Sequence, residues 1–305
     1  MPVYKGVHGM RYQLYRSVPV VWRSTRCVQF GVDSPVLIDG LTAADTELIN
    51  AIRMGISARD FDARAAHLEV SPTRSASLLS LLREAGVLMP VERTAYRAGS
   101  TTHVDAYAAR IRAEPSSITG QLTRPSVLVL GPLRRGLQAL LVAAGMRADI
   151  IDRAEDALTA DRPLVVLTGA WVDDAVGAGF LHEHGIDHCH VTVGQEQVRL
   201  SHVIRAQETP CTRCAIGFRC DDDADWFGSW QALWQQAPSA SLLDPVLCAL
   251  AYAHQAERVR EHILNPGCVA DDLVVSAGGE VVIETPEFHA SCDCRASVLQ
   301  HLSRV

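Results

Sequence analysis

Hydrophobic and polar positions in the first ninety residues form short β-rich runs followed by helical periods. The β-rich runs cover residues 19–23, 27–31 and 35–39. Three helical patterns come next and open at Thr42, Ser57 and Ser71, residue types that cap helix N-termini. An apolar run over residues 87–91 closes the segment as a further strand. This order predicts a small winged-helix-like domain over residues 1–91.

The next segment, residues 92–124, is polar and shows no sustained periodicity. A short helical pattern appears near residues 105–112, and Pro115 and Pro125 interrupt the rest. We therefore expect a linker between two domains.

From residue 126 onward, apolar runs alternate with helical patterns. The apolar runs cover residues 126–130, 149–151, 163–168, 188–193 and 198–204. The helical patterns cover residues 132–145, 173–184, 226–236 and 242–264. Fully apolar strands connected by helices are typical of a sheet buried on both faces, and a final hairpin turns at Gly278-Gly279. The predicted fold class is α/β, with a doubly wound, mostly parallel sheet over residues 125–305.

Composition narrows the range of functions. Of 305 residues, 48% are hydrophobic and 21% are charged, which fits a chain with a sizeable core. No window approaches ~18 consecutive apolar residues, and the N-terminus lacks a secretion signal, so we expect a cytoplasmic protein without membrane contact. The net charge is −7, although the first 90 residues hold ten basic and eight acidic side chains. Neither half has the basic face that nucleic-acid binding needs.

Two close pairs of cysteines are the clearest chemical signal. Cys211 and Cys214 form one pair, and Cys292 and Cys294 form the other. Four thiolates bind zinc tetrahedrally at ~2.3 Å, and such a closed set leaves no position for a substrate. The pairs therefore predict a structural zinc site, with unrelated free thiols as the alternative. A total of nine cysteines without an export signal favours a reducing compartment.

A glycine-containing turn, Gly131 to Gly136, lies between a predicted strand and a predicted helix, where a dinucleotide-binding fingerprint would lie. The fingerprint needs a central glycine so that the backbone can approach phosphate, and Leu133 occupies that position. Asp152 stands where a ribose-binding acid would lie, or else caps the next segment. Phosphate sites commonly use lysine, and Lys5 is the only lysine of the chain. We interpret the turn as a degenerate nucleotide site and expect no ATP there.

Three further patterns have an ordinary structural explanation. His188 and His190 share one face of a strand, but no third ligand follows, so we interpret them as sheet histidines. The acidic run 221–225 fits the solvated start of a helix. A tryptophan stripe from Trp226 to Trp234 has helical spacing and predicts core or dimer packing.

The residues around the cysteine pairs resemble the ThiF-like (ubiquitin-activating-enzyme-like) superfamily. The resemblance rests on Thr209-Pro-Cys-Thr-Arg-Cys214 with Trp226 after an acidic run, and on Phe288-His289 before Cys292-Asp-Cys294. A ThiF-like domain preceded by a winged helix resembles the leader-binding "C" or ocin-ThiF-type components of azoline-forming peptide cyclodehydratases. Those components partner YcaO-type enzymes. Leu133 sets this chain apart from the adenylating relatives.

The resemblance implies a peptide-binding groove in the N-terminal domain. A leader peptide would add as a strand to the edge at residues 35–39 and place apolar side chains beside the helix at residues 73–85. The residues implied in this groove are Val36, Ile38, Leu78 and Leu82, with Arg74 and Arg26 meeting acidic leader residues. The alternative is that the same leucines form the core of so small a domain.

The resulting hypothesis is a non-catalytic, zinc-stabilised recognition protein. It would bind the leader of a ribosomally made precursor peptide and present the peptide to a YcaO-type cyclodehydratase that forms thiazoles and oxazoles. A homodimer through the ThiF-like domain would fit the same resemblance. One alternative is an adenylating ThiF-like enzyme that acts on a peptide or carrier carboxylate. The other is a winged-helix DNA-binding regulator, although the helix at 73–85 carries only Arg74 and Arg83 as cations.

Overall fold

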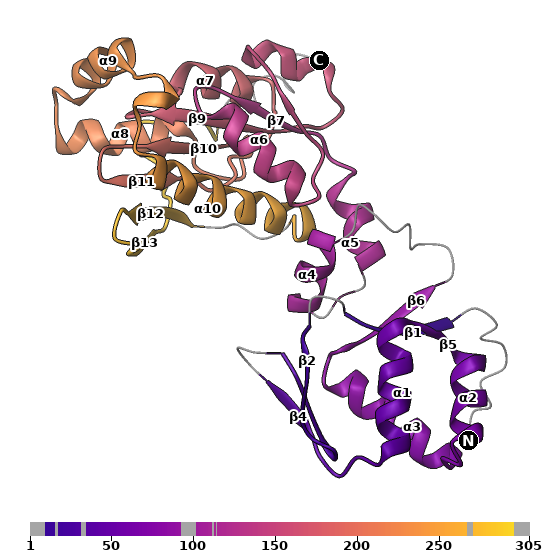
Figure 1. The fold of residues 1–305 in the computed structure, drawn as a ribbon. Helices are drawn as coiled ribbons and strands as arrows, with labels where there is room; N and C mark the ends of the chain where they lie inside the picture. Colours follow the sequence, from indigo (N-terminus) through magenta and orange to yellow (C-terminus); the bar gives the residue numbers. More distant parts are fainter. Residues whose placement is uncertain are drawn as a thin grey trace. The chain divides into compact units, whose positions relative to one another are not determined.

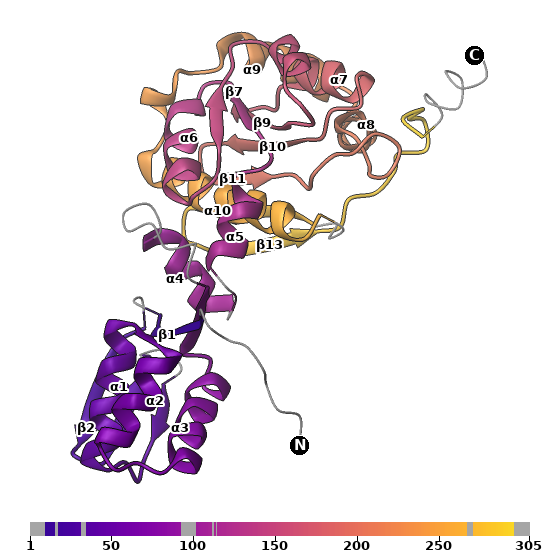
Figure 2. The ribbon, with the colours of Figure 1, turned by 90° about the vertical axis from the view of Figure 1, so that its right-hand side faces the viewer.

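The computed structural model describes residues 10–15, 18–31, 35–92, 102–111, 113, 115–266 and 271–295. Lys5 and Cys268 therefore lie outside the described residues. The chain divides into two compact units, Met1–Gly120 and Gln121–Val305. Figure 1 and Figure 2 show their elements in two views.

Within the N-terminal unit, the described residues between 10 and 92 form two small antiparallel sheets and three helices. One sheet has the order β2 (Val20–Ser24), β3 (Cys27–Phe30) and β4 (Val36–Ile38). The other has the order β5 (Ile56–Ser57), β1 (Met10–Leu14) and β6 (Leu88–Glu92). The four predicted strands are confirmed, whereas β1 and β5 are additions that the pattern did not predict.

The three helices begin at the predicted capping residues. They are α1 (Ala43–Met54), α2 (Ala58–His67) and α3 (Pro72–Glu84). The side chains of Thr42, Ser57 and Ser71 each accept a hydrogen bond from a backbone N–H of the first helical turn. Figure 2 shows the three helices side by side. Their apolar faces form one buried cluster with the first sheet, in which Phe30 and Phe61 are at most 1% exposed.

The expected linker contains two helices. They are α4 (Thr102–Ile111) and α5 (Pro115–Leu122). Each buries a pair of apolar residues four positions apart: Val104 with Ala108, and Ile118 with Leu122. Two apolar residues give too short a period to stand out in a polar segment, so the sequence pattern revealed at most one of these helices.

A seven-stranded mixed sheet forms the centre of the C-terminal unit, in the order β13-β12-β11-β10-β9-β7-β8. Its strands are β7 (Val127–Leu130), β8 (Ala148–Ile150), β9 (Leu164–Ala170), β10 (His188–Val193), β11 (Gln197–Leu200), β12 (Asp272–Ser276) and β13 (Val281–Glu284). Strands β8, β7, β9 and β10 are parallel, whereas β10 to β13 pair antiparallel. The sheet is therefore mixed rather than mostly parallel. The chain reverses at the expected turns at Gly194 and Gly279, and β12 pairs antiparallel with β11, which the sequence pattern did not predict.

Helices cover both faces of this sheet. The helices are α6 (Arg134–Ala143), α7 (Ala175–Glu183), α8 (Thr212–Asp222), α9 (Trp226–Gln236) and α10 (Pro245–Leu264). In Figure 1 and Figure 2, α6 and α10 lie on one side of the sheet and α7 on the other. The alternating residues Leu128 and Leu130 face α7, where they pack with Ala178 and Leu181. Among the described residues, no helix combines the length and apolarity that a membrane crossing needs.

Candidate functional site

The four predicted metal-binding cysteines meet at one point. Cys211 caps the start of α8, Cys214 lies in its first turn, and the chain after β13 returns with Cys292 and Cys294. The Sγ atoms are 3.6 Å apart for Cys211–Cys292 and for Cys214–Cys294, and 3.9 Å apart for Cys211–Cys214. A tetrahedron with ~2.3 Å metal–sulfur bonds has edges of about 3.8 Å. The cluster could therefore hold one metal ion, and its geometry and ligands are compatible with zinc.

Burial of the cluster favours a structural rather than a catalytic role for a metal ion held by these cysteines. Cys211, Cys214 and Cys294 are at most 4% exposed. In the metal-free protein, burial raises the pKa of the Cys292 thiol to about 11 and raises that of Cys294 as well. A bound divalent cation would favour the thiolate forms instead, so metal binding and folding of this region would be coupled.

The segment carrying the second cysteine pair is tied to α8 by several contacts. His289 Nε2 lies 2.9 Å from Asp221 Oδ2. A β-carbon at Gly217 would lie 2.6 Å from His289 Nδ1, so only glycine allows the ring to approach the helix this closely. Arg213 and Asp293 add an exposed ion pair at 3.6 Å.

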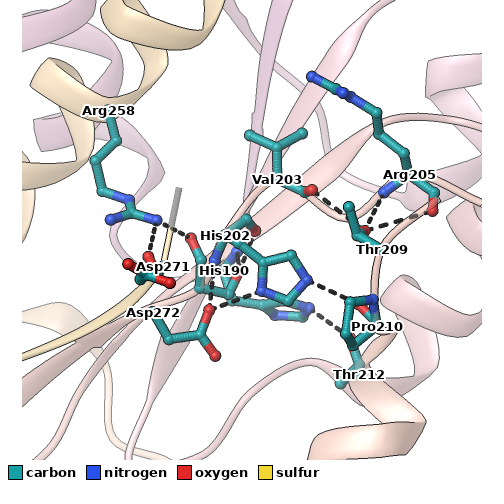
Figure 3. Close-up of polar contacts among 11 residues, drawn as sticks. His190, His202, Val203, Arg205, Thr209, Pro210, Thr212, Arg258, Asp271 and Asp272 are labelled. Carbon is teal, nitrogen blue, oxygen red and sulfur yellow. Dashed lines mark hydrogen bonds and ion pairs between the residues drawn. The ribbon is translucent and has the colours of Figure 1, made fainter. Parts of the chain in front are cut away.

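A buried histidine holds the loop that leads into the first cysteine pair (Figure 3). His202, 4% exposed, places Nδ1 2.7 Å from Asp272 Oδ1 and Nε2 2.8 Å from the Pro210 carbonyl oxygen. A carbonyl oxygen only accepts, so the contact to Pro210 is a hydrogen bond donated by Nε2–H. His202 thus links β12 to the residue that precedes Cys211.

Two other side chains in Figure 3 fix the same loop. From α10, Arg258 Nη2 donates to the carbonyl oxygens of Ser201 and Asp271, at 3.1 and 2.6 Å. Thr209 Oγ1 accepts from the Arg205 backbone N–H at 2.9 Å. The loop is therefore held from β12, from α10 and from within itself.

The predicted degenerate nucleotide turn is a packed strand-to-helix connection. Gly131 has φ +101°, and a β-carbon there would lie 2.1 Å from the Thr168 carbonyl oxygen. Leu133 is 1% exposed, and its backbone N–H donates to Thr168 Oγ1 at 3.0 Å. The Thr168 hydroxyl in turn donates to the Leu130 carbonyl oxygen at 2.8 Å. The backbone N–H of Leu133 therefore already has a hydrogen-bond partner within the protein.

The other members of that turn also have partners inside the protein. A β-carbon at Gly136 would lie 2.5 Å from the Tyr252 ring, so this glycine permits close packing against α10. Asp152 pairs with Arg134 at 3.0 Å. A cavity of about 460 Å³ remains over the turn, lined by Leu133 and Tyr252 among others.

The proposed groove residues do not all lie where the resemblance implies. Ile38, Leu78 and Leu82 are 7%, 3% and 0% exposed and belong to the core cluster of the N-terminal unit. Val36 is half-buried, and its neighbour Leu37, which sequence reasoning did not single out, is 58% exposed. The core explanation therefore holds for the two leucines and the isoleucine, because a domain of this size needs them inside.

Arg74 is engaged within the unit. It pairs with Asp45 at 2.7 Å and donates to the Gly40 carbonyl oxygen at 3.0 Å. The Asp45 side chain is fully buried. Burial alone would raise the pKa of its carboxyl group, but hydrogen bonds from Arg74 and Thr42 hold that pKa below its usual value. Arg74 thereby fixes the start of α3 beside the end of β4.

Three histidines fill the interior between the sheet and the cysteine cluster. His182, His188 and His190 are 6%, 1% and 4% exposed. Burial lowers the pKa of all three imidazoles, and that of His188 falls to about 3. Within the described ranges, the four cysteines are the only group placed to hold a metal ion. The histidines are therefore core residues.

A charged cluster that sequence reasoning missed lies after the carboxyl end of β9. Asp173 accepts a hydrogen bond from Thr192 and lies 3.6 Å from Arg219. Burial alone would raise the pKa of the Asp173 carboxyl group, but His190, Arg219 and the hydrogen bond from Thr192 hold that pKa below its usual value. The only signal in the sequence is an acidic residue after a parallel strand, the position where open α/β sheets bind ligands.

No protein-family model matches the sequence, and no curated protein matches it. Solved structures share its fold. The heterocyclase TruD matches at a TM-score of 0.64 and 17% identity, over 92% of this chain and 42% of that chain. A heterocyclase in complex with substrate and cofactor matches at 0.66 and 17%, over 95% and 40%.

E. coli MccB bound to ATP matches at a TM-score of 0.61 and 11% identity, over 93% of this chain and 99% of that chain. The microcin C7 biosynthetic enzyme MccB in complex with N-formylated MccA matches at 0.60 and 10%, over 94% and 100%. Identities this low show a shared fold alone. This chain spans less than half the length of the heterocyclases and nearly all of MccB.

Proposed function

We propose that this protein binds the leader of a ribosomally made precursor peptide along β4 and presents the peptide to a separate YcaO-type cyclodehydratase. The observation that carries the proposal is the edge strand β4, which pairs with β3 and with no other strand in the described part of the chain. An extended peptide can add to such an edge through main-chain hydrogen bonds. Likeness to heterocyclases and to MccB in complex with MccA supports a peptide as the ligand.

Side chains along β4 would set the register of the peptide. Val36 is half-buried and Leu37 is 58% exposed, so the strand offers apolar contacts on both faces. Arg26 is exposed and available to an acidic leader residue. The guanidinium of Arg74 is already paired with Asp45, so Arg74 would attract an acidic leader residue only through its remaining charge.

The same proposal assigns no chemistry to this chain. Leu133 and Thr168 occupy the turn where a nucleotide would bind, and zinc at the four cysteines has a structural role. The proposal places the cyclodehydratase chemistry on a separate enzyme; this chain covers 42% of the heterocyclase TruD. In this view the N-terminal unit is a winged-helix-like domain, and the C-terminal unit is a doubly wound ThiF-like domain that forms a cytoplasmic homodimer.

Leader binding is tested with a fluorescently labelled precursor leader and the variant Leu37→Glu. Loss of one buried leucine contact, about 1.5–3 kcal/mol, predicts roughly 10- to 150-fold weaker binding. Val21→Glu is the matched control, because Val21 is 44% exposed and lies on the same face at the opposite edge of the sheet. Equal loss in both variants, or in neither, would contradict binding at β4.

The adenylating enzyme stays as the second candidate, because MccB bound to ATP shares the fold over 99% of its length. The cavity over the Gly131 turn and the acidic residue Asp173 are the features that favour it. ATP–pyrophosphate exchange by the purified protein, dependent on the precursor peptide, would establish this candidate and remove the non-catalytic proposal.

A further inference from the structure

Helix α9 carries an exposed aromatic surface that the proposed leader and zinc sites do not use. Phe227, Leu233 and Trp234 are 55%, 40% and 39% exposed, whereas Trp230 is 8% exposed. In the tryptophan stripe predicted from the sequence, the central Trp230 is therefore buried, whereas Trp234 and the neighbouring Phe227 are exposed. Figure 1 shows α9 at the periphery of the C-terminal unit, next to α8. Large exposed aromatic side chains gathered on one helix are typical of interaction sites.

The aromatic rings of this surface form a continuous ladder. Trp230 stacks against Phe227 and against Trp234, with ring centroids 5.8 Å apart in both pairs and planes inclined by 24° and 21°. Trp230 Nε1–H also donates to the Asp173 carbonyl oxygen at 3.3 Å, which anchors the ladder to the unit. The two outer rings are thus held in place before any partner arrives, which reduces the entropy lost on binding.

Acidic side chains dominate the sequence around the ladder. From residue 220 to residue 257 the sequence contains no lysine or arginine, and Asp221, Asp222, Asp223 and Asp225 precede the helix as exposed residues. The nearest cation, Arg219, lies over the Trp226 ring at 5.2 Å and faces Asp173. The acidic residues beside the ladder repel nucleic acid and anionic membranes, and they repel the same surface on a second copy of the chain.

We infer that the α9 face docks a protein whose contact surface is an apolar socket with a basic rim, and that this protein is the cyclodehydratase of the proposed function. The inference rests on that function for the identity of the partner. Rigid tryptophan and phenylalanine side chains are the residues that dominate binding energy at protein interfaces, and complementary charge speeds association.

The test measures the affinity of the purified chain for the YcaO-type cyclodehydratase encoded beside its gene, by titration calorimetry. Phe227→Ala/Trp234→Ala should weaken binding at least 30-fold. Gln231→Ala/Gln235→Ala, at exposed positions of the same helix, should leave it within 2-fold. Asp222→Arg/Asp225→Arg should also weaken binding and reduce its dependence on salt, and this variant leaves the ladder intact.

Equal affinity of wild type and the aromatic variant would overturn the inference, and so would wild-type protein that does not bind the cyclodehydratase. If the aromatic variant instead abolishes self-association in sedimentation, the face belongs to a second copy and the inference fails. Circular dichroism and zinc content confirm that each variant is folded. The labelled leader is titrated into the same samples. A wild-type protein that binds the cyclodehydratase through α9 but does not bind the leader would refute the leader proposal alone.

Discussion

Replacement of His202 by alanine should destabilise the C-terminal unit by about 3 kcal/mol. The change removes the contact to Asp272 at 2.7 Å and the hydrogen bond to the Pro210 carbonyl oxygen at 2.8 Å. A hydrogen bond to a charged group contributes about 1.5–3 kcal/mol and a neutral one about 1 kcal/mol. The Asp272 side chain is 28% exposed, so water recovers part of the loss, which places the expected value near the low end of about 3–5 kcal/mol for broken buried pairs.

The assay is urea unfolding followed by tryptophan fluorescence, together with the rate of zinc transfer to a chromogenic chelator. His202→Ala should lower the free energy of unfolding and accelerate zinc release, because Pro210 directly precedes the ligand Cys211. The matched control is Asp271→Asn, since Asp271 contributes its backbone carbonyl to Arg258 and keeps it in the variant. A change in the free energy of unfolding below about 0.5 kcal/mol, with an unchanged rate of zinc release, would refute the stabilising role of the His202 contacts.

Three other predictions concern metal, packing and pH. Cys211→Ser/Cys292→Ser should lower zinc, measured by plasma mass spectrometry, from about one per chain to none. Gly136→Ala should destabilise by about 1–3 kcal/mol in urea unfolding because its β-carbon would meet Tyr252 at 2.5 Å, and Tyr252→Ala in the same chain should restore part of that loss. The pKa of His188 is about 3 in the folded protein and 6.5 in the unfolded chain, so between these pH values only the unfolded chain binds the proton. The free energy of unfolding should therefore fall as the pH drops below 6.5, by about 2 kcal/mol at pH 5. The fall should be smaller in His188→Leu.

Local signals in the sequence were sufficient for most elements. The caps at Thr42, Ser57 and Ser71 fixed the starts of three helices because a side-chain acceptor at the N-cap acts within one turn. The cysteine spacing predicted a cluster that the structure brings within 4.8 Å. Both signals depend on chemistry carried by a few residues.

Features that depend on distant packing were missed. The antiparallel half of the sheet follows from pairing of β11 with β12, which are separated by three helices in the chain. The role of His202 requires Asp272, seventy positions away, and no periodicity reveals such a pair. Leu78 and Leu82, which the resemblance placed in the groove, are buried in the core of the N-terminal unit; apolar residue type alone does not distinguish these two positions.

The cysteine pairs close very large loops, with partners 81 and 80 positions apart. A cross-link over that span removes about 4.5 kcal/mol of chain entropy from the unfolded state, as estimated for a covalent bridge. Everything from α8 to β13 lies inside these loops. A metal ion held by all four cysteines could be captured only after Cys294 has left the ribosome. Loss of such an ion would release the loops that contain α8, α9 and the β12–β13 hairpin, whereas the parallel strands β7, β8, β9 and β10 lie outside these loops.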